Sequence, residues 1–139
     1  MYEDNKQNRN EVGYMQCELE IEHNKLTQWN WMVTKPWNLV LGKHTDIGAF
    51  TYINAAQGVT ICDDVQIGSH CSIYSVSTID GKLGPVVIKK NGRVGTHTTI
   101  MPNVTIGENA IVGAHSFVTC NIPDNEMWWG IPASFRRIV

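Results

Sequence analysis

The sequence predicts an all-β chain wound as a triangular parallel β-helix, and two observations support this fold class. Between residues 94 and 118 an aliphatic residue recurs every sixth position, at Val94, Ile100, Ile106, Val112 and Val118. A period of six is neither the strand period of two nor the helical period of 3.6, and it is typical of hexapeptide β-helices. The fifth hexad position is small or β-branched, as at Thr45, Thr51, Val65, Cys71, Ser77, Thr98, Val104, Ala110 and Ser116.

Each hexad is expected to form a short strand and a corner, so that three hexads make one coil of the prism. The aliphatic residue points inward, and successive coils lie about 4.8 Å apart, the spacing of hydrogen-bonded strands. The hexads run from Leu41, with two extra residues assigned to Val59 and Thr60 and a longer insertion at residues 79–87. Asn103 takes a corner position where a left-handed backbone is expected.

The length of the chain suits one domain. We expect a tail and covering segment over residues 1–38, the β-helix over 39–123 and a C-terminal cap over 124–139. The formal net charge of -2 gives no reason to expect nucleic acid or an anionic membrane as a partner. No apolar run approaches a membrane span, the N-terminus lacks the apolar core of a signal peptide, and the four cysteines are scattered. These features lead us to expect a cytoplasmic protein.

The stretch VVIKKNGRVGTHTTIMPNVTIGENAIVGAHSFVTCNIPDNEMWWGIPASFRR, residues 86–137, resembles the last coils of the galactoside and maltose O-acetyltransferases. The wider resemblance, to hexapeptide-repeat acyltransferases, covers roughly residues 39–137. It implies a left-handed β-helix that transfers an acetyl group from acetyl-CoA to a sugar hydroxyl or, in relatives, to the amino group of a nucleotide-linked sugar. It also implies a homotrimer with active sites between subunits and no metal.

Four histidines occupy the fourth hexad position, at His44, His70, His97 and His115. Counting hexads places Ala56, Val76, His97 and His115 on one edge of the prism, and His44 and His70 on other edges. The resemblance assigns the catalytic base to His97, because it stands in the hexad before IMP. Imidazole accepts a proton near neutral pH, as an acceptor hydroxyl requires when it attacks a thioester.

The resemblance also implies where acetyl-CoA binds. Its pantetheine arm would follow VGAHSFVTCNIP, with contacts at Ala114 and Thr119. Arg136 and Arg137 would hold the CoA phosphates, since guanidinium suits phosphate geometry, and Trp129 would stack on adenine. Two residues depart from the family pattern, which has basic side chains at the positions of Cys120 and Ser134.

The acceptor is expected to be a sugar or nucleotide-sugar other than a simple galactoside. Alanines replace the acidic and amide residues of the galactoside enzymes at positions 55 and 56. The candidate acceptor contacts are Asn54, His70, Tyr74, Asp80 and Lys82. The sequence leaves open whether oxygen or nitrogen is acylated. Direct transfer is expected, because the small packed positions of two cysteines do not favour a reactive thiolate.

Two other functions remain open at this point. A trimeric β-helix without chemistry is one alternative, although a scaffold has no reason to keep a histidine before IMP. A γ-type carbonic anhydrase is the other, and it needs two histidines separated by four residues on one chain. The prism histidines here are instead 26, 27 and 18 residues apart.

Overall fold

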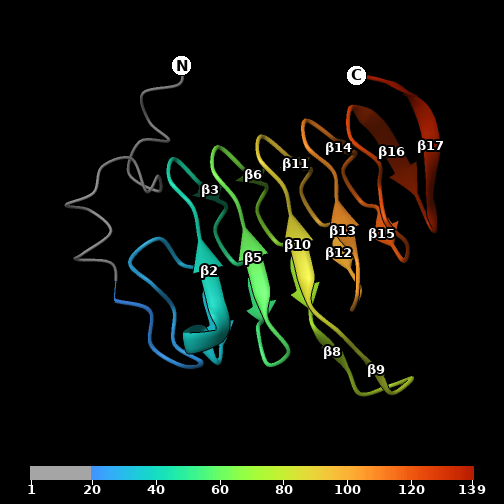
Figure 1. The fold of residues 1–139 in the computed structure, drawn as a ribbon. Helices are drawn as coiled ribbons and strands as arrows, with labels where there is room; N and C mark the ends of the chain where they lie inside the picture. Colours follow the sequence, from blue (N-terminus) through green and yellow to red (C-terminus); the bar gives the residue numbers. More distant parts are fainter. Residues whose placement is uncertain (1–19) are drawn as a thin grey trace.

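The computed structural model describes residues 20–139, which form a left-handed parallel β-helix with three walls (Figure 1). The five-stranded wall consists of β1 (Met32–Thr34), β4 (Tyr52–Asn54), β7 (Ser72–Tyr74), β12 (Thr99–Ile100) and β15 (Phe117–Val118). The four-stranded wall consists of β2 (Leu39–Leu41), β5 (Val59–Ile61), β10 (Val86–Ile88) and β13 (Thr105–Ile106). The six-stranded wall consists of β3 (Asp46–Ile47), β6 (Gln66–Ile67), β11 (Arg93–Val94), β14 (Ile111–Val112), β16 (Glu126–Gly130) and β17 (Ala133–Ile138).

Two smaller features complete the described part of the chain. A 3-10 turn, η2 (Pro36–Asn38), precedes β2, and a hairpin of β8 (Val76–Ser77) and β9 (Lys82–Leu83) projects from the stack (Figure 1). No helix in the described part of the chain is long and apolar enough to cross a membrane.

The aliphatic residues of the hexads fill the prism, as predicted. Ile53 pairs in register with Ile73, and Ile73 with Ile100, and all three are fully buried. Removing a side chain of this size from water stabilises the fold by about 2 kcal/mol, so each wall is held by its inward column.

The coils differ in length, and the hexad count put the extra residues of the longer coils at the wrong positions. In-register partners are separated by 20 residues between β4 and β7, by 27 between β7 and β12, and by 18 between β12 and β15. Val59 and Thr60 are regular members of β5, so they are not the extra residues. The extra length lies in two corners, at residues 55–58 between β4 and β5 and in the segment between β7 and β10 that carries the hairpin.

The stack extends beyond the boundaries at residues 39 and 123 in both directions. At one end β1 pairs with β4, and at the other β16 adds to the six-stranded wall beside β14. The cap segment 124–139 therefore continues the wall and then folds back as the antiparallel strand β17. The predicted tail lies in part outside the described residues.

The small fifth position of the hexad is explained by bonds between coils. Thr98 donates its hydroxyl to the Gly113 carbonyl of the next coil at 3.2 Å, and the Cys71 thiol lies 3.2 Å from the Gly95 carbonyl. The glycine allows this close approach, because a Cβ at Gly95 would lie 2.5 Å from the backbone nitrogen of Ala114. Buried hydroxyls are thus satisfied without widening the prism.

Candidate functional site

Three imidazoles and one phenyl ring form a column along one corner of the prism, here called the histidine corner: Phe50, His70, His97 and His115. The rings of His70 and His97 stack with centroids 4.8 Å apart and planes 3° from parallel. His115 stacks on the other face of His97, also at 4.8 Å. The expected edge was therefore wrong in part, because His70 belongs to it while Ala56 and Val76 do not. The error arose because residues 79–87 were counted as a hexad, whereas most of them belong to the insertion that carries the hairpin between β7 and β10.

The backbone explains why histidines occupy this position. His70, His97 and His115 have φ of 56°, 58° and 57°, in the left-handed region. Among residues with a Cβ, Asn, Asp and His enter that region most readily. A histidine in the fourth hexad position is therefore favoured by the corner itself, and position alone does not indicate catalysis.

Hydrogen bonding distinguishes His97 from its two neighbours. Its Nδ1 lies 2.9 Å from the hydroxyl oxygen of Thr96, and its side chain is exposed. Within residues 20–139, neither His70 nor His115 has a side-chain hydrogen bond to its ring. The central imidazole is thus sandwiched between two rings and also held at one nitrogen.

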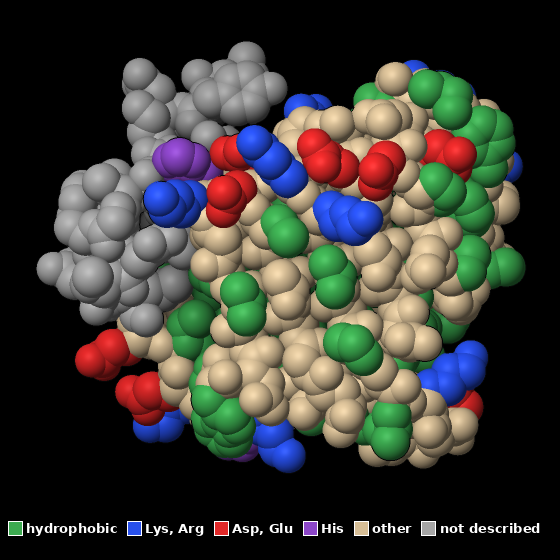
Figure 2. Space-filling model, in the orientation of Figure 1, with side chains coloured by type: hydrophobic (Ala, Val, Ile, Leu, Met, Phe, Trp, Pro, Cys, Tyr) green, Lys and Arg blue, Asp and Glu red, His purple; other side chains and the backbone are tan. Residues whose placement is uncertain are grey.

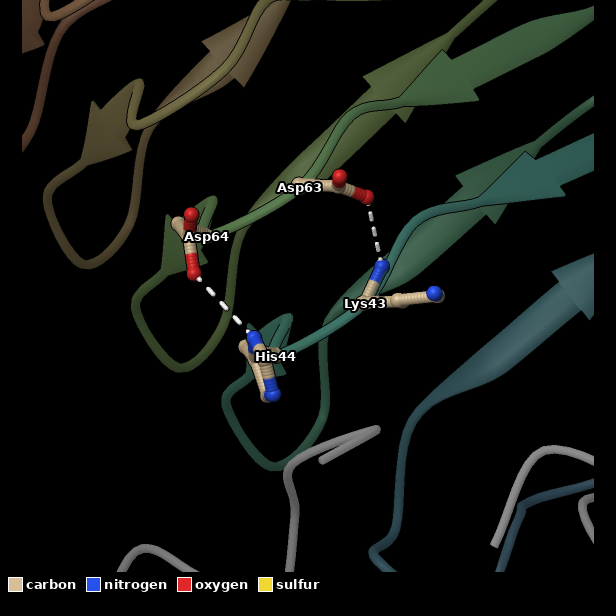
Figure 3. Close-up of polar contacts among 4 residues, drawn as sticks. All are labelled: Lys43, His44, Asp63 and Asp64. Carbon is tan, nitrogen blue, oxygen red and sulfur yellow. Dashed lines mark hydrogen bonds and ion pairs between the residues drawn. The ribbon is translucent and has the colours of Figure 1, made fainter. Parts of the chain in front are cut away.

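A second corner, here called the amide corner, has the same backbone conformation but different side-chain contacts: His44, Asp64, Asn91, Asn109 and Asn125. His44 lies 3.4 Å from the Asp64 carboxylate, and the backbone N–H of Lys43 donates to Asp63 at 2.8 Å (Figure 3). Further along, the amide of Asn91 donates to Asn109 at 2.8 Å, and that of Asn109 to Asn125 at 3.0 Å. These side chains bind one coil to the next.

The outer face of the four-stranded wall, shown in Figure 2, has few charges across its centre. Charged side chains gather in a band along its upper edge (Figure 2). The residues that immediately precede those of the amide corner in the chain are charged and exposed, namely Lys43, Asp63, Lys90, Glu108 and Asp124. Because these residues carry charges of both signs, they do not form a basic surface for nucleic acid.

A groove of about 550 Å³ runs along the six-stranded wall beside the histidine corner. Its floor includes Gly68, Gly95, Gly113 and Ala114, so small residues expose backbone along its length. Ala114, an expected donor contact, therefore lines this groove. Thr119 does not line it, because Ala114 precedes β15 whereas Thr119 follows the other end of this strand.

Trp129 and Arg136 lie next to this groove at the end of the wall. Trp129 is 40% exposed, and a Cβ added at Gly113 would lie 2.7 Å from the Cβ of Trp129. The Arg136 guanidinium lies 5.1 Å from the centre of the Trp129 ring, and its Nε donates to the Trp129 carbonyl. Arg136 has no register partner in the β16–β17 pairing, where the register shifts, while the neighbouring Arg137 pairs with Met127. The bulge thus directs one arginine over the tryptophan.

A second hollow of about 490 Å³ lies between the five-stranded wall and the hairpin. It brings together three of the expected acceptor residues, Asn54, Tyr74 and Asp80, with Phe117 from β15. Lys82 lies 3.5 Å from the Asp80 carboxylate, and a hydrogen bond from the Ser77 hydroxyl is the main cause that lowers the pKa of Asp80. His70 lies at the histidine corner instead of in this hollow.

The sequence interpretation missed Thr96 and Ser69. Their hydroxyls are 3.1 Å apart, and Thr96 is the residue that contacts His97. The signal was present, since Thr96 immediately precedes the histidine, but its side chain could have pointed elsewhere. In the part of the chain that the structure describes, no group of three His, Cys, Asp or Glu side chains is arranged to hold a metal ion.

Comparison with known proteins agrees with this architecture. The family model "Bacterial transferase hexapeptide (six repeats)" matches residues 85–120. The galactoside O-acetyltransferase of Escherichia coli K12 is 32% identical over 99% of this chain and 74% of its own length. That of Lactococcus lactis is also 32% identical, over 69% of this chain and 54% of its own length, so the chain spans only about half of that relative.

Solved structures give the same result. A galactoside acetyltransferase in complex with coenzyme A superposes with a TM-score of 0.73 at 26% identity, over 85% of this chain and 64% of that one. A Vibrio cholerae hexapeptide-repeat acetyltransferase in complex with acetyl-CoA superposes with a TM-score of 0.74 at 26% identity, over 78% and 64%. A variant of AntD, a Bacillus cereus N-acyltransferase, in complex with dTDP-4-amino-4,6-dideoxyglucose and coenzyme A, gives 0.57 at 27%, over 78% and 70%.

The fold and the repeats define a left-handed β-helix of the hexapeptide class. The chain belongs to the hexapeptide-repeat acetyltransferase family, in the group that contains the galactoside O-acetyltransferases. The resemblance drawn from the sequence is confirmed.

Proposed function

We propose that this chain is an acetyltransferase that moves an acetyl group from acetyl-CoA to a hydroxyl or amino group of a sugar. The observation that carries the proposal is the oriented imidazole of His97, exposed at the histidine corner beside a groove lined with small residues. Membership in a family of acetyltransferases supports the class of reaction.

His97 is the general base in this proposal. Its Nε2 accepts the proton from the acceptor group as that group forms a bond to the thioester carbonyl carbon. The carbon–sulfur bond then breaks, and His97 returns the proton to the CoA sulfur. Direct transfer fits Cys71, whose pKa is raised because the thiol is desolvated, which keeps it protonated and weakly nucleophilic.

The donor would lie in the groove of the six-stranded wall. The small residues Gly95, Gly113 and Ala114 let a narrow flexible chain such as pantetheine lie close to the backbone of this wall. At the end of the groove, Trp129 offers an aromatic face and Arg136 a guanidinium for phosphate. Arg137 and Thr119 are weaker donor contacts, because the one lies beyond the bulge and the other at the far end of β15.

The acceptor would bind between two subunits of the trimer, in the hollow beside the hairpin of one subunit and facing the histidine corner of the next. Tyr74 and Phe117 offer faces for the apolar side of a sugar ring, while Asn54, Asp80 and Lys82 offer polar groups to its hydroxyls. His70 would contact the acceptor from its place beside His97. The dTDP-amino sugar bound to the AntD variant supports including an amine among the acceptors.

The proposal includes a homotrimer, because the hairpin exposes large apolar side chains in a single subunit. Ile79 at its tip is 98% exposed and Leu83 is 60% exposed. Such apolar side chains are expected to be covered by a partner. Light scattering should give the mass of three chains, and Ile79→Asp should weaken assembly relative to Thr60→Asp in the four-stranded wall.

The proposed function is tested by titrating the protein with acetyl-CoA in a calorimeter, with free CoA as the comparison. Saturable binding near one molecule per chain is expected, followed by CoA release when sugars and nucleotide-sugars are screened as acceptors. No binding at millimolar acetyl-CoA would contradict the proposal and favour a scaffold without chemistry.

A further inference from the structure

The hydroxyl groups next to His97 form a short chain of hydrogen bonds with a defined direction. Thr96 Oγ1 lies 2.7 Å from the backbone carbonyl oxygen of Ser69, 3.1 Å from the Ser69 hydroxyl and 2.9 Å from His97 Nδ1. The backbone N–H of His97 donates to the same Ser69 carbonyl at 3.1 Å. The side chain of Thr96 is therefore tied to the preceding coil at the point where that coil meets the imidazole.

Donor and acceptor counting determines which atom carries each proton. A carbonyl oxygen can only accept, so the Thr96 hydroxyl donates its single hydrogen to the backbone carbonyl of Ser69. The Thr96 oxygen is then an acceptor toward its two other neighbours, and His97 Nδ1 must be the donor. A neutral imidazole has one N–H, so the lone pair is left on Nε2.

We propose that Thr96 is a positioning residue that holds His97 in its Nδ1–H form and directs the Nε2 lone pair outward to the acceptor. This inference rests on the proposed function, in which His97 is the general base. It concerns one chemical property of that base, namely which nitrogen is available to accept a proton.

The two neighbouring histidines show why this contact is selective. His115 stacks on His97 but is preceded by Ala114, which has no hydroxyl. His70 is preceded by Ser69, whose hydroxyl is directed to Thr96. Of three imidazoles on one corner, only the central one has its tautomer set by a neighbouring side chain, and the flanking rings restrain its plane.

The test measures the ring nitrogens of His97 by long-range proton–nitrogen NMR on the intact protein. Spectra are recorded at about pH 8.5, where an ordinary imidazole is neutral. The signals are assigned by their loss in His97→Gln. We expect Nδ1 to be protonated in the natural protein and in Thr96→Ser. In Thr96→Val, which keeps the shape but lacks the hydroxyl, the population should move toward Nε2–H.

Steady-state kinetics supply the second readout. For Thr96→Val we expect kcat to fall by about ten- to a hundredfold, because the wrong nitrogen carries the proton, with KM for acetyl-CoA unchanged. Thr96→Ser should restore kcat to within about threefold, since the acceptor oxygen returns. Thr60→Val, on the far wall, is the matched control and should behave as the natural protein.

The outcomes separate the inference from the proposed function. An Nε2–H ring in the natural protein, or an unchanged tautomer in Thr96→Val, overturns the inference even if His97 proves essential. An Nδ1–H ring that Thr96→Val disturbs supports the positioning role. If His97→Gln then leaves turnover intact, it is the proposed function that fails. The spectrum of the natural protein decides the tautomer even if Thr96→Val does not fold.

Discussion

The histidine corner and the amide corner share one backbone and differ in what their side chains do. His97 and Asn109 both have left-handed φ, 58° and 59°, and both donate a backbone N–H to the preceding coil. At the amide corner, side chains bond to one another from coil to coil, so their polar groups are used within the fold. At the histidine corner the rings stack face to face, which leaves ring nitrogens at the surface.

This difference shows that backbone geometry and chemistry impose separate requirements on the same position. The left-handed turn restricts the choice to Asn, Asp, His and a few others, whichever corner is considered. Only the neighbours then decide whether the side chain holds the coils together or faces a ligand. His44, paired with Asp64, illustrates a histidine that performs the first task (Figure 3).

The largest expected effect comes from replacing the central imidazole. His97→Asn keeps a residue that tolerates the left-handed turn, so it removes the proposed base with little strain. We expect turnover to fall by about two to four orders of magnitude, with acetyl-CoA affinity nearly unchanged. His44→Asn at the amide corner is the matched control and should keep full activity. If turnover of His97→Asn stays within tenfold of the natural protein, the base is another group.

Disruption of the amide corner should instead change stability. Asn109→Ala removes two side-chain hydrogen bonds and puts alanine in a left-handed turn, which should cost about 2 kcal/mol in the free energy of unfolding. Asn109→Gly loses the same bonds without the strain and should cost about 1 kcal/mol. Urea unfolding measures both, and activity per folded chain should stay unchanged. Equal losses for the two variants would show that left-handed strain is not involved.

Removing a flanking ring should give a smaller change. His115→Asn takes away one of the two rings that restrain His97, and we expect kcat to fall about two- to fivefold, in line with the energy of one aromatic contact. KM for acetyl-CoA should not move if the effect is on the orientation of the imidazole. An increase in KM with constant kcat would instead indicate that His115 contacts the donor.

The smallest effect concerns the reactivity of the cysteines. Burial raises the pKa of the Cys71 thiol, so its thiolate becomes abundant only at pH values above the usual thiol range. In a Cys17→Ser background, iodoacetamide should therefore modify exposed Cys120 first, half-buried Cys62 later and Cys71 last. Mass spectrometry of timed samples measures the order, and early modification of Cys71 would show that the histidine corner opens in solution.

The repeat itself made much of this structure predictable. Inward aliphatic residues every six positions require a three-walled prism, and the small fifth residue follows from the tight packing between coils. His97 was identified because the residues around it match a family motif. Of the predicted acceptor contacts, Asn54, Tyr74 and Asp80 lie in one hollow, whereas the predicted donor contacts Ala114 and Thr119 lie at opposite ends of β15.

By itself, then, the sequence determined the walls, the inward columns and the residue that the motif marks as the base. Only the tertiary structure decided which side chains share a corner, because coils of 20, 27 and 18 residues bring His70, His97 and His115 into one stack. The physical reason is that a corner can absorb extra residues at small cost, whereas hydrogen bonds between strands admit one register. Counting along the chain cannot tell where the extra length is absorbed, and the contact between Thr96 and His97 depends on that register as well.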